Sequence, residues 1–108
     1  MGTLNQLRDS AHKTARAKGW WDEERTFGDL IALCHSELSE ALEEYRNGHE
    51  PAEVHYQFEP LSYAPHILRQ RAKPEGIPIE LADVLIRVFD MAGFYGIDLD
   101  TAVRLKME

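Results

Sequence analysis

The chain has 108 residues, of which 44% are hydrophobic and 29% charged, a composition typical of one globular domain. Nineteen acidic residues against twelve basic ones give a formal charge of −7 at pH 7, which disfavours binding to long nucleic acids. No apolar run reaches the roughly 18 residues of a membrane span, no secretory signal is recognisable, and the single cysteine, Cys34, excludes an internal disulfide. We therefore expect one cytoplasmic domain over residues 1–108, with no membrane partner.

Two amphipathic helices are predicted in the first half of the chain. The first covers about residues 3–18, has a narrow apolar stripe and ends at Gly19. The second begins after Thr26, whose hydroxyl group can cap a helix, and runs to about Arg46 before an Asn-Gly pair. The second pattern is the clearest in the chain.

Two more helices are predicted in the second half. The third begins near Pro78, a residue suited to a first helical turn, and runs to about Tyr95 with Gly96 as its stop. It is apolar on almost every side. A short fourth helix begins with Asp98 as its cap and directs Leu99 inward.

A proline-rich connection separates the second helix from the third. All the prolines of the chain fall in one stretch: Pro51, Pro60, Pro65, Pro74 and Pro78. Alternating residues flanked by tight hairpin turns, the signature of paired strands, are absent. The sequence therefore predicts an all-α, four-helix bundle-like fold with an irregular connection between the second and third main helices.

Acidic residues border the apolar stripe of the second helix. At about 100° per residue, Glu37, Glu40 and Glu44 fall along one flank of that stripe. Glu43 points to the opposite face. Glutamates three residues apart are common on solvated helix faces, so this pattern alone is a weak indication of a metal site.

The third helix carries its polar residues in one narrow stripe, formed by Glu80, Asp83, Arg87 and Asp90. A buried, unpaired charge costs several kcal/mol, so something must neutralise these acids. Salt bridges from Glu80 and Asp83 to Arg87 are one solution. A bound cation is the other.

Two E-x-x-[ED] pairs on core-bordering helices favour the cation. Two neighbouring carboxylates about 4 Å apart repel by about 4 kcal/mol at an effective dielectric near 20, and a divalent ion converts this repulsion into ligation. Ligand sets made only of oxygen favour Mg²⁺ or Mn²⁺ over zinc. The predicted metal ligands are Glu37, Glu40, Glu80 and Asp83.

These two pairs resemble the metal motifs of the all-α nucleoside triphosphate pyrophosphohydrolases, the MazG-like family. The first pair, Glu37 and Glu40, lies in HSELSEALEEYR, and the second, Glu80 and Asp83, lies in KPEGIPIELADVLIRVFDMAGFYGID. The similarity covers roughly residues 20–105. Many members carry a further acid directly before the first motif glutamate, where this chain has Ser36.

The resemblance implies hydrolysis of a nucleoside triphosphate between its α and β phosphates, giving a monophosphate and pyrophosphate, in a house-cleaning role on the nucleotide pool. It implies a Mg²⁺ or Mn²⁺ cofactor and a homodimer or homotetramer. Glu37 or Glu40 would position or deprotonate the attacking water. The nucleotide preferred stays open, because phosphoribosyl-ATP and dUTP hydrolases share the scaffold.

Four further residues are candidates for substrate binding. Trp20 and Trp21 can stack on a base, although adjacent tryptophans at a helix junction are more often core or interface residues. Arg71 and Lys73 can reach phosphates, with a solvated basic loop as the alternative. The five histidines show no metal-type spacing and are interpreted as polar surface or cap residues.

Two other functions compete with the pyrophosphohydrolase. A di-iron carboxylate bundle needs Glu-x-x-His motifs, to which only Asp9 and His12 come near. A noncatalytic helical module would use the acidic stripe to bind a basic partner. Metal-dependent release of pyrophosphate discriminates the enzyme from the module.

The third helix also predicts self-association. The narrow stripes of the other helices cannot enclose Val84, Ile86, Val88 and Phe89 together. A second subunit would cover the remainder, so we expect a homo-oligomer with the third helix near its interface.

Overall fold

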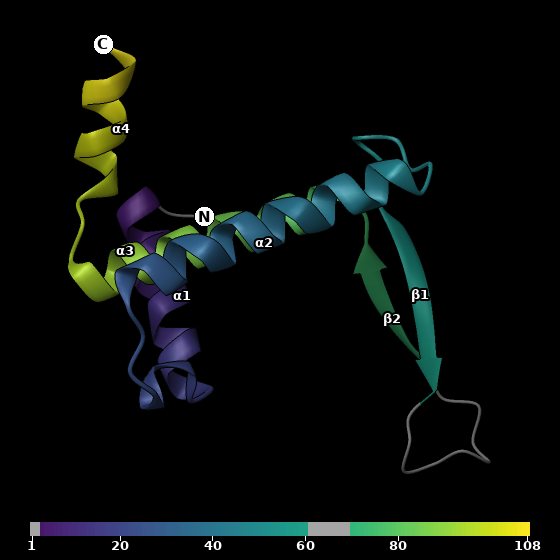
Figure 1. Ribbon diagram of the computed structural model, residues 1–108, viewed down its shortest axis with the longest axis horizontal. Coiled ribbons are helices and arrows are strands. Elements are labelled where there is room, and N and C mark those ends of the chain that lie inside the picture. Colours follow the sequence, from purple (N-terminus) through teal and green to yellow (C-terminus); the bar gives the residue numbers. More distant parts are fainter. Residues whose placement is uncertain (1–2, 61–69) are drawn as a thin grey trace. The chain divides into compact units, whose positions relative to one another are not determined.

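The computed structural model describes residues 3–60 and 70–108, without the side chains of residues 59, 60, 70 and 71. Figure 1 shows the helices and the paired strands of these residues. In chain order the elements are α1 (Leu4–Ala17), the 3₁₀ turn η1 (Trp20–Asp22), α2 (Phe27–Arg46), β1 (His55–Pro60), β2 (Gln70–Glu75), α3 (Ile77–Tyr95) and α4 (Leu99–Met107). Over the described ranges, every helix is too short or too polar to cross a lipid bilayer.

The predicted start of the first helix is confirmed by a reciprocal cap. The Thr3 hydroxyl oxygen accepts a hydrogen bond from the Gln6 backbone N–H at 3.2 Å, and the Gln6 side-chain oxygen accepts one from the Thr3 N–H at 2.7 Å. Two backbone donors that lack partners within the helix are thereby satisfied. At the other end Gly19 has φ of 85°, a conformation that glycine adopts without steric penalty.

The other predicted helix ends are also confirmed. The Thr26 hydroxyl accepts from the Asp29 N–H at 3.1 Å, and the Asp98 carboxylate accepts from the Thr101 N–H at 3.0 Å. Three hydrogen bonds to the Asp98 carboxylate, from Asn5 and from the backbone and hydroxyl of Thr101, lower its pKa to about 2.

The prediction of an irregular connection is wrong over two of its segments. Strands β1 and β2 pair antiparallel, with His55 opposite Glu75 and Pro60 opposite Gln70 (Figure 1). Pro60 and Pro74 fit these strands because both members of a two-stranded sheet are edge strands, where a missing N–H can face solvent. The fold is therefore mostly helical with a small hairpin.

The chain divides into two compact units, one formed by residues 1–36 with 83–108 and the other by residues 37–82. In the first unit α1 approaches α3 closely at Gly93, where an added Cβ would lie 2.6 Å from His12 Cβ. Buried Asp90 accepts a hydrogen bond from Trp21 Nε1 at 2.8 Å, and His12 Nδ1 lies 2.8 Å from the same oxygen. The Trp21 ring stacks on Phe94, with centroids 4.1 Å apart.

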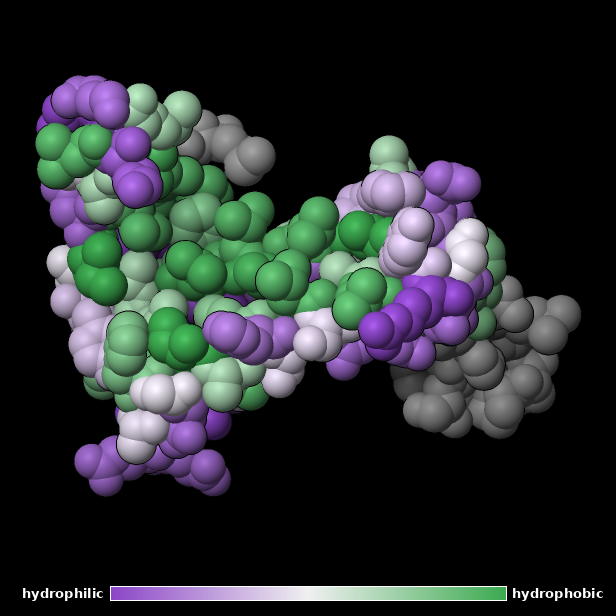
Figure 2. Space-filling model, turned by 45° about the horizontal axis from the view of Figure 1, so that its top comes forward, coloured by the Kyte–Doolittle hydropathy of each residue, from purple (hydrophilic) through white to green (hydrophobic). Residues whose placement is uncertain are grey.

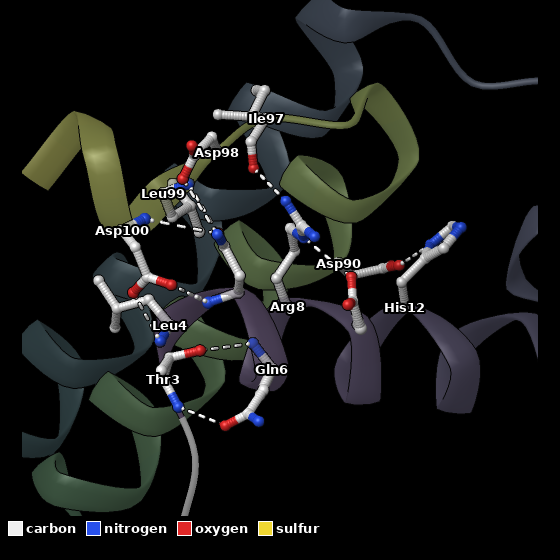
Figure 3. Close-up of polar contacts among 12 residues, drawn as sticks. Thr3, Leu4, Gln6, Arg8, His12, Asp90, Ile97, Asp98, Leu99 and Asp100 are labelled. Carbon is white, nitrogen blue, oxygen red and sulfur yellow. Dashed lines mark hydrogen bonds and ion pairs between the residues drawn. The ribbon is translucent and has the colours of Figure 1, made fainter.

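The N-terminal turns of α1 bind the segment that leads into α4 (Figure 3). Arg8 donates a hydrogen bond to the Ile97 carbonyl at 2.7 Å, and the Asn5 side chain accepts from the Leu99 N–H at 2.9 Å. In return, the Asp100 carboxylate accepts from the Leu4 N–H at 3.0 Å. These polar contacts fix where α4 begins.

The second unit joins its hairpin to α3 through Gly76. This residue has φ of 125°, and a Cβ at this position would lie 2.5 Å from the Glu53 carbonyl oxygen. Gly48, after the end of α2, also has a positive φ of 95°, but no atom lies within 4 Å of its hypothetical Cβ. Both backbone conformations would be strained for any other residue, but only Gly76 is also crowded by a neighbouring backbone atom.

We predict that Gly76→Ala destabilises the protein much more than Gly48→Ala. Left-handed strain alone gives a loss of about 1–2 kcal/mol in the free energy of unfolding at Gly48, whereas the added clash with backbone brings the loss at Gly76 to about 3 kcal/mol or more. Urea unfolding of both variants measures the difference. Equal losses would show that the Glu53–Gly76 approach contributes nothing.

Candidate metal centre

Three of the four predicted ligands lie together. Glu37 is on α2, and Glu80 and Asp83 are three residues apart on α3. Each offers one carboxylate oxygen, and the three oxygens all lie within 4.8 Å of one another. All three residues are partly buried. Glu37 and Glu80 belong to the unit of residues 37–82, and Asp83 follows one turn after Glu80 on the same helix.

Glu40, the fourth predicted ligand, is placed differently. It is exposed and does not belong to the group of Glu37, Glu80 and Asp83. It nevertheless lies three residues after Glu37 on the same helix, so the two side chains are neighbours along one flank of α2. Glu43, predicted to point to the opposite face, is also exposed.

The donor set of the carboxylate group suits a hard divalent cation. Carboxylate oxygens are the ligands that Mg²⁺ and Mn²⁺ prefer, and Mg²⁺ commonly uses only one or two protein carboxylates together with water and phosphate oxygens. Partial burial strengthens the attraction of the group for a cation, because water screens the charges less than at an open surface. The residues therefore fit the predicted magnesium site.

The two tryptophans have different surroundings in the first unit. Trp20 makes two cation–π contacts. The guanidinium carbon of Arg25 lies 3.5 Å from the Trp20 ring centroid, and the guanidinium carbon of Arg87 lies 4.4 Å from the same centroid. Trp21 is anchored through its hydrogen bond to Asp90 and its stacking on Phe94, which fits the interpretation of this residue as part of the core. Trp21 also borders an open hollow lined by Lys13, Arg16, Ala17, Trp21 and Asp22.

The two basic candidates lie on strand β2. Lys73 is exposed and stands opposite Gln57 in the hairpin register. Arg71 stands opposite Glu59, and its side chain lies outside the described residues. Cys34, interpreted as a core residue, is partly buried.

A second group of potential ligands is not predicted from the sequence. Glu44, His49 and His55 each offer one ligand atom, and the three atoms lie within 4.8 Å of one another. Their spacing matches no simple metal motif, because the residues belong to a helix, a turn and a strand. The only signal in the sequence is the position of Glu44 on the same flank as Glu37.

No family model, no curated protein and no solved structure matches this chain. The similarity to MazG-like enzymes therefore stays a prediction that rests on the two helical motifs, Glu37 with Glu40 and Glu80 with Asp83. The geometry of the carboxylate group does not depend on this similarity.

We predict that Mg²⁺ raises the thermal midpoint of the chain and that Asp83→Asn removes most of this increase. An ion bound only by the folded state stabilises it by about 2.7 kcal/mol at one hundred times its dissociation constant. Glu43→Gln, which changes an exposed acid of α2, should retain the full increase. Differential scanning calorimetry with Mg²⁺ and with a chelator measures both. A shift that survives in Asp83→Asn would place the ion elsewhere.

Proposed function

We propose that the chain is a divalent-metal-dependent nucleoside triphosphate pyrophosphohydrolase that cleaves the α–β phosphate bond. The observation that carries the proposal is the group of three carboxylate oxygens from α2 and α3, within 4.8 Å of one another. The resemblance of both helical motifs to the MazG-like family supports the same activity. A cytosolic enzyme of this kind would act on canonical, deoxy or damaged nucleotides.

The carboxylates have separate roles in this proposal. Glu37, Glu80 and Asp83 would hold Mg²⁺ or Mn²⁺, which when bound offsets phosphate charge and lowers the pKa of water. Glu40 is exposed on the same flank of α2 as Glu37, and in this proposal its carboxylate would accept a proton from the attacking water. We therefore assign the base to Glu40 rather than to the ligand Glu37.

Metal is essential because the chain itself repels its substrate. A protein with a formal charge of −7 and a triphosphate repel each other, and a cation at the carboxylate group provides the attraction. Lys73 and Arg71 remain the proposed contacts to phosphates and Trp20 the proposed contact to the base, whereas Trp21 already stacks on Phe94. The alternative function, a noncatalytic module that binds a basic partner, uses the same acids without metal.

Incubation with a panel of nucleoside triphosphates and Mg²⁺ or Mn²⁺ tests the reaction. We expect nucleoside monophosphate and pyrophosphate in equal amounts, and no product in the presence of a chelator. Release of orthophosphate with diphosphate left behind would contradict the proposed bond cleavage. A folded protein without turnover on any nucleotide would favour the interaction module.

Substitutions separate the ligands from the base. Glu37→Gln, Glu80→Gln and Asp83→Asn should each abolish most activity and raise the Mg²⁺ concentration that is needed for half-maximal rate. Glu40→Gln should lower kcat by about 10²–10⁴-fold with little change in Mg²⁺ dependence, because a general base contributes a factor of this size. The matched control, Glu43→Gln, should keep wild-type kinetics. If Glu43→Gln loses as much as Glu40→Gln, the assignment by helical face is wrong.

We also propose that the enzyme is a homo-oligomer. Figure 2 shows many hydrophobic residues at the surface, and several large ones are exposed on α2 and on α3. On α2 the residues Leu38, Leu42 and Tyr45, at helical spacing, are 54%, 48% and 60% exposed. On α3, Leu85 and Ile86 are 55% and 53% exposed, whereas Val84, Val88 and Phe89 are partly buried. Apolar stripes of this kind favour burial against a second copy of the chain.

Light scattering and activity across a dilution series test the assembly. We expect a dimer or tetramer whose activity falls as it dissociates, and Leu42→Glu should shift the dissociation to higher protein concentration. A fully active monomer at micromolar concentration would refute the proposal. Arg46→Glu controls for the added negative charge, because Arg46 is an exposed, polar residue of the same helix. This variant should dissociate at the same protein concentration as the wild type.

A further inference from the structure

Glu44, His49 and His55 meet at one end of the second unit, and they come from three successive elements. Glu44 lies in the last turns of α2, His49 lies three residues after the end of this helix, and His55 is the first residue of β1. All three are partly buried. We propose that these side chains bind one divalent transition-metal ion, with Zn²⁺ as the best fit.

The distances between the ligand atoms suit a single ion. Glu44 Oε2 lies 3.5 Å from His49 Nε2 and 3.5 Å from His55 Nε2. In a tetrahedral zinc site with bonds of 2.0–2.1 Å, neighbouring ligand atoms stand roughly 3.4 Å apart. The separations of these atoms therefore suit one ion, provided that the two rings turn their Nε2 lone pairs toward it.

His55 supplies an independent observation. Its Nε2 atom is buried and has no hydrogen-bond partner. Among the described residues, His55 is the only side chain with such an atom. A buried polar atom without such a partner destabilises the folded state. Coordination of a metal ion would satisfy this nitrogen.

Glu53 orients the His49 ring through a contact at Nδ1. His49 Nδ1 lies 2.9 Å from Glu53 Oε2, and the Glu50 N–H donates to the other oxygen of the same carboxylate at 3.2 Å. A carboxylate that accepts from Nδ1–H leaves the lone pair on Nε2 for the ion, an arrangement common in zinc sites.

The rings of His49 and His55 are stacked, so metal binding requires them to rotate. Their centroids are 4.2 Å apart and their planes differ by 11°, so the two Nε2 lone pairs lie in nearly parallel planes. Binding to one ion requires the rings to turn toward each other and to lose this stacking. Three protein ligands then leave a fourth position for water or another small ligand.

The donor chemistry distinguishes this site from the carboxylate group. Two imidazole nitrogens and one carboxylate oxygen favour Zn²⁺ and its neighbours in the transition series, whereas three carboxylate oxygens favour Mg²⁺. Zinc binding at this site is independent of the proposed nucleotide hydrolysis. A bound ion would tie the hairpin to the end of α2.

Titration of the full, tag-free chain with Zn²⁺ in excess Mg²⁺ tests the site. Isothermal titration calorimetry should show one Zn²⁺ per chain with micromolar or tighter affinity. Glu44→Gln, His49→Gln and His55→Gln should each weaken binding by at least about tenfold, and Glu53→Gln by about tenfold or more through the orientation of His49. Bound Co²⁺ should give the visible absorption of a tetrahedral site, and the histidine ring resonances should shift.

Matched controls change neighbours of the ligands. Glu43→Gln and His35→Gln alter exposed residues of α2 and should bind Zn²⁺ as the wild type does. Circular dichroism of each metal-free variant shows whether the variant still folds. For the variants that fold, Co²⁺ absorption then shows whether the tetrahedral metal site is retained. The proposal is overturned if the wild type binds no Zn²⁺, if His55→Gln binds it unchanged, or if Glu80→Gln abolishes binding.

Discussion

The proposed activity depends on the electrostatics of three carboxylates held close together by two helices. Two unit charges 4.8 Å apart repel by about 3.5 kcal/mol at an effective dielectric near 20, and Glu37, Glu80 and Asp83 are no farther apart than this. A divalent cation in contact with all three lowers this energy more than a single basic side chain can. The same cation would make an acidic protein attractive to a triphosphate.

The helices could be predicted from the sequence because their ends are determined locally. Thr3, Thr26 and Asp98 satisfy the first N–H groups of α1, α2 and α4, and glycines with positive φ follow α1, α2 and α3. The hairpin cannot be predicted in the same way, because its prolines taken alone indicate irregular structure. A strand tolerates proline when it lies at the edge of a sheet. Whether a strand lies at an edge depends on the whole sheet and cannot be read from the segment itself.

The sites were predictable to the extent that they lie on single helices. Helical periodicity placed Glu80 beside Asp83 and put Glu37, Glu40 and Glu44 on one flank of α2, but it carries no information about what each flank meets. In the structure the three glutamates of that flank have different surroundings. Glu37 belongs to the carboxylate group and Glu40 is exposed. Glu44 lies near two histidines, about 10 Å from Glu37 along the helix axis. The histidines could not be placed from the sequence, since the turn after α2 and the start of β1 bring them together.

The most direct test of the central claim is the position of the catalytic ion. Crystals grown with Mn²⁺ and a non-hydrolysable nucleoside triphosphate allow an anomalous difference map to locate manganese independently of any structural assumption. We predict a peak within bonding distance of Glu37, Glu80 and Asp83, with the α and β phosphates on its open side. Manganese and nucleotide bound away from these three carboxylates would contradict the proposed site.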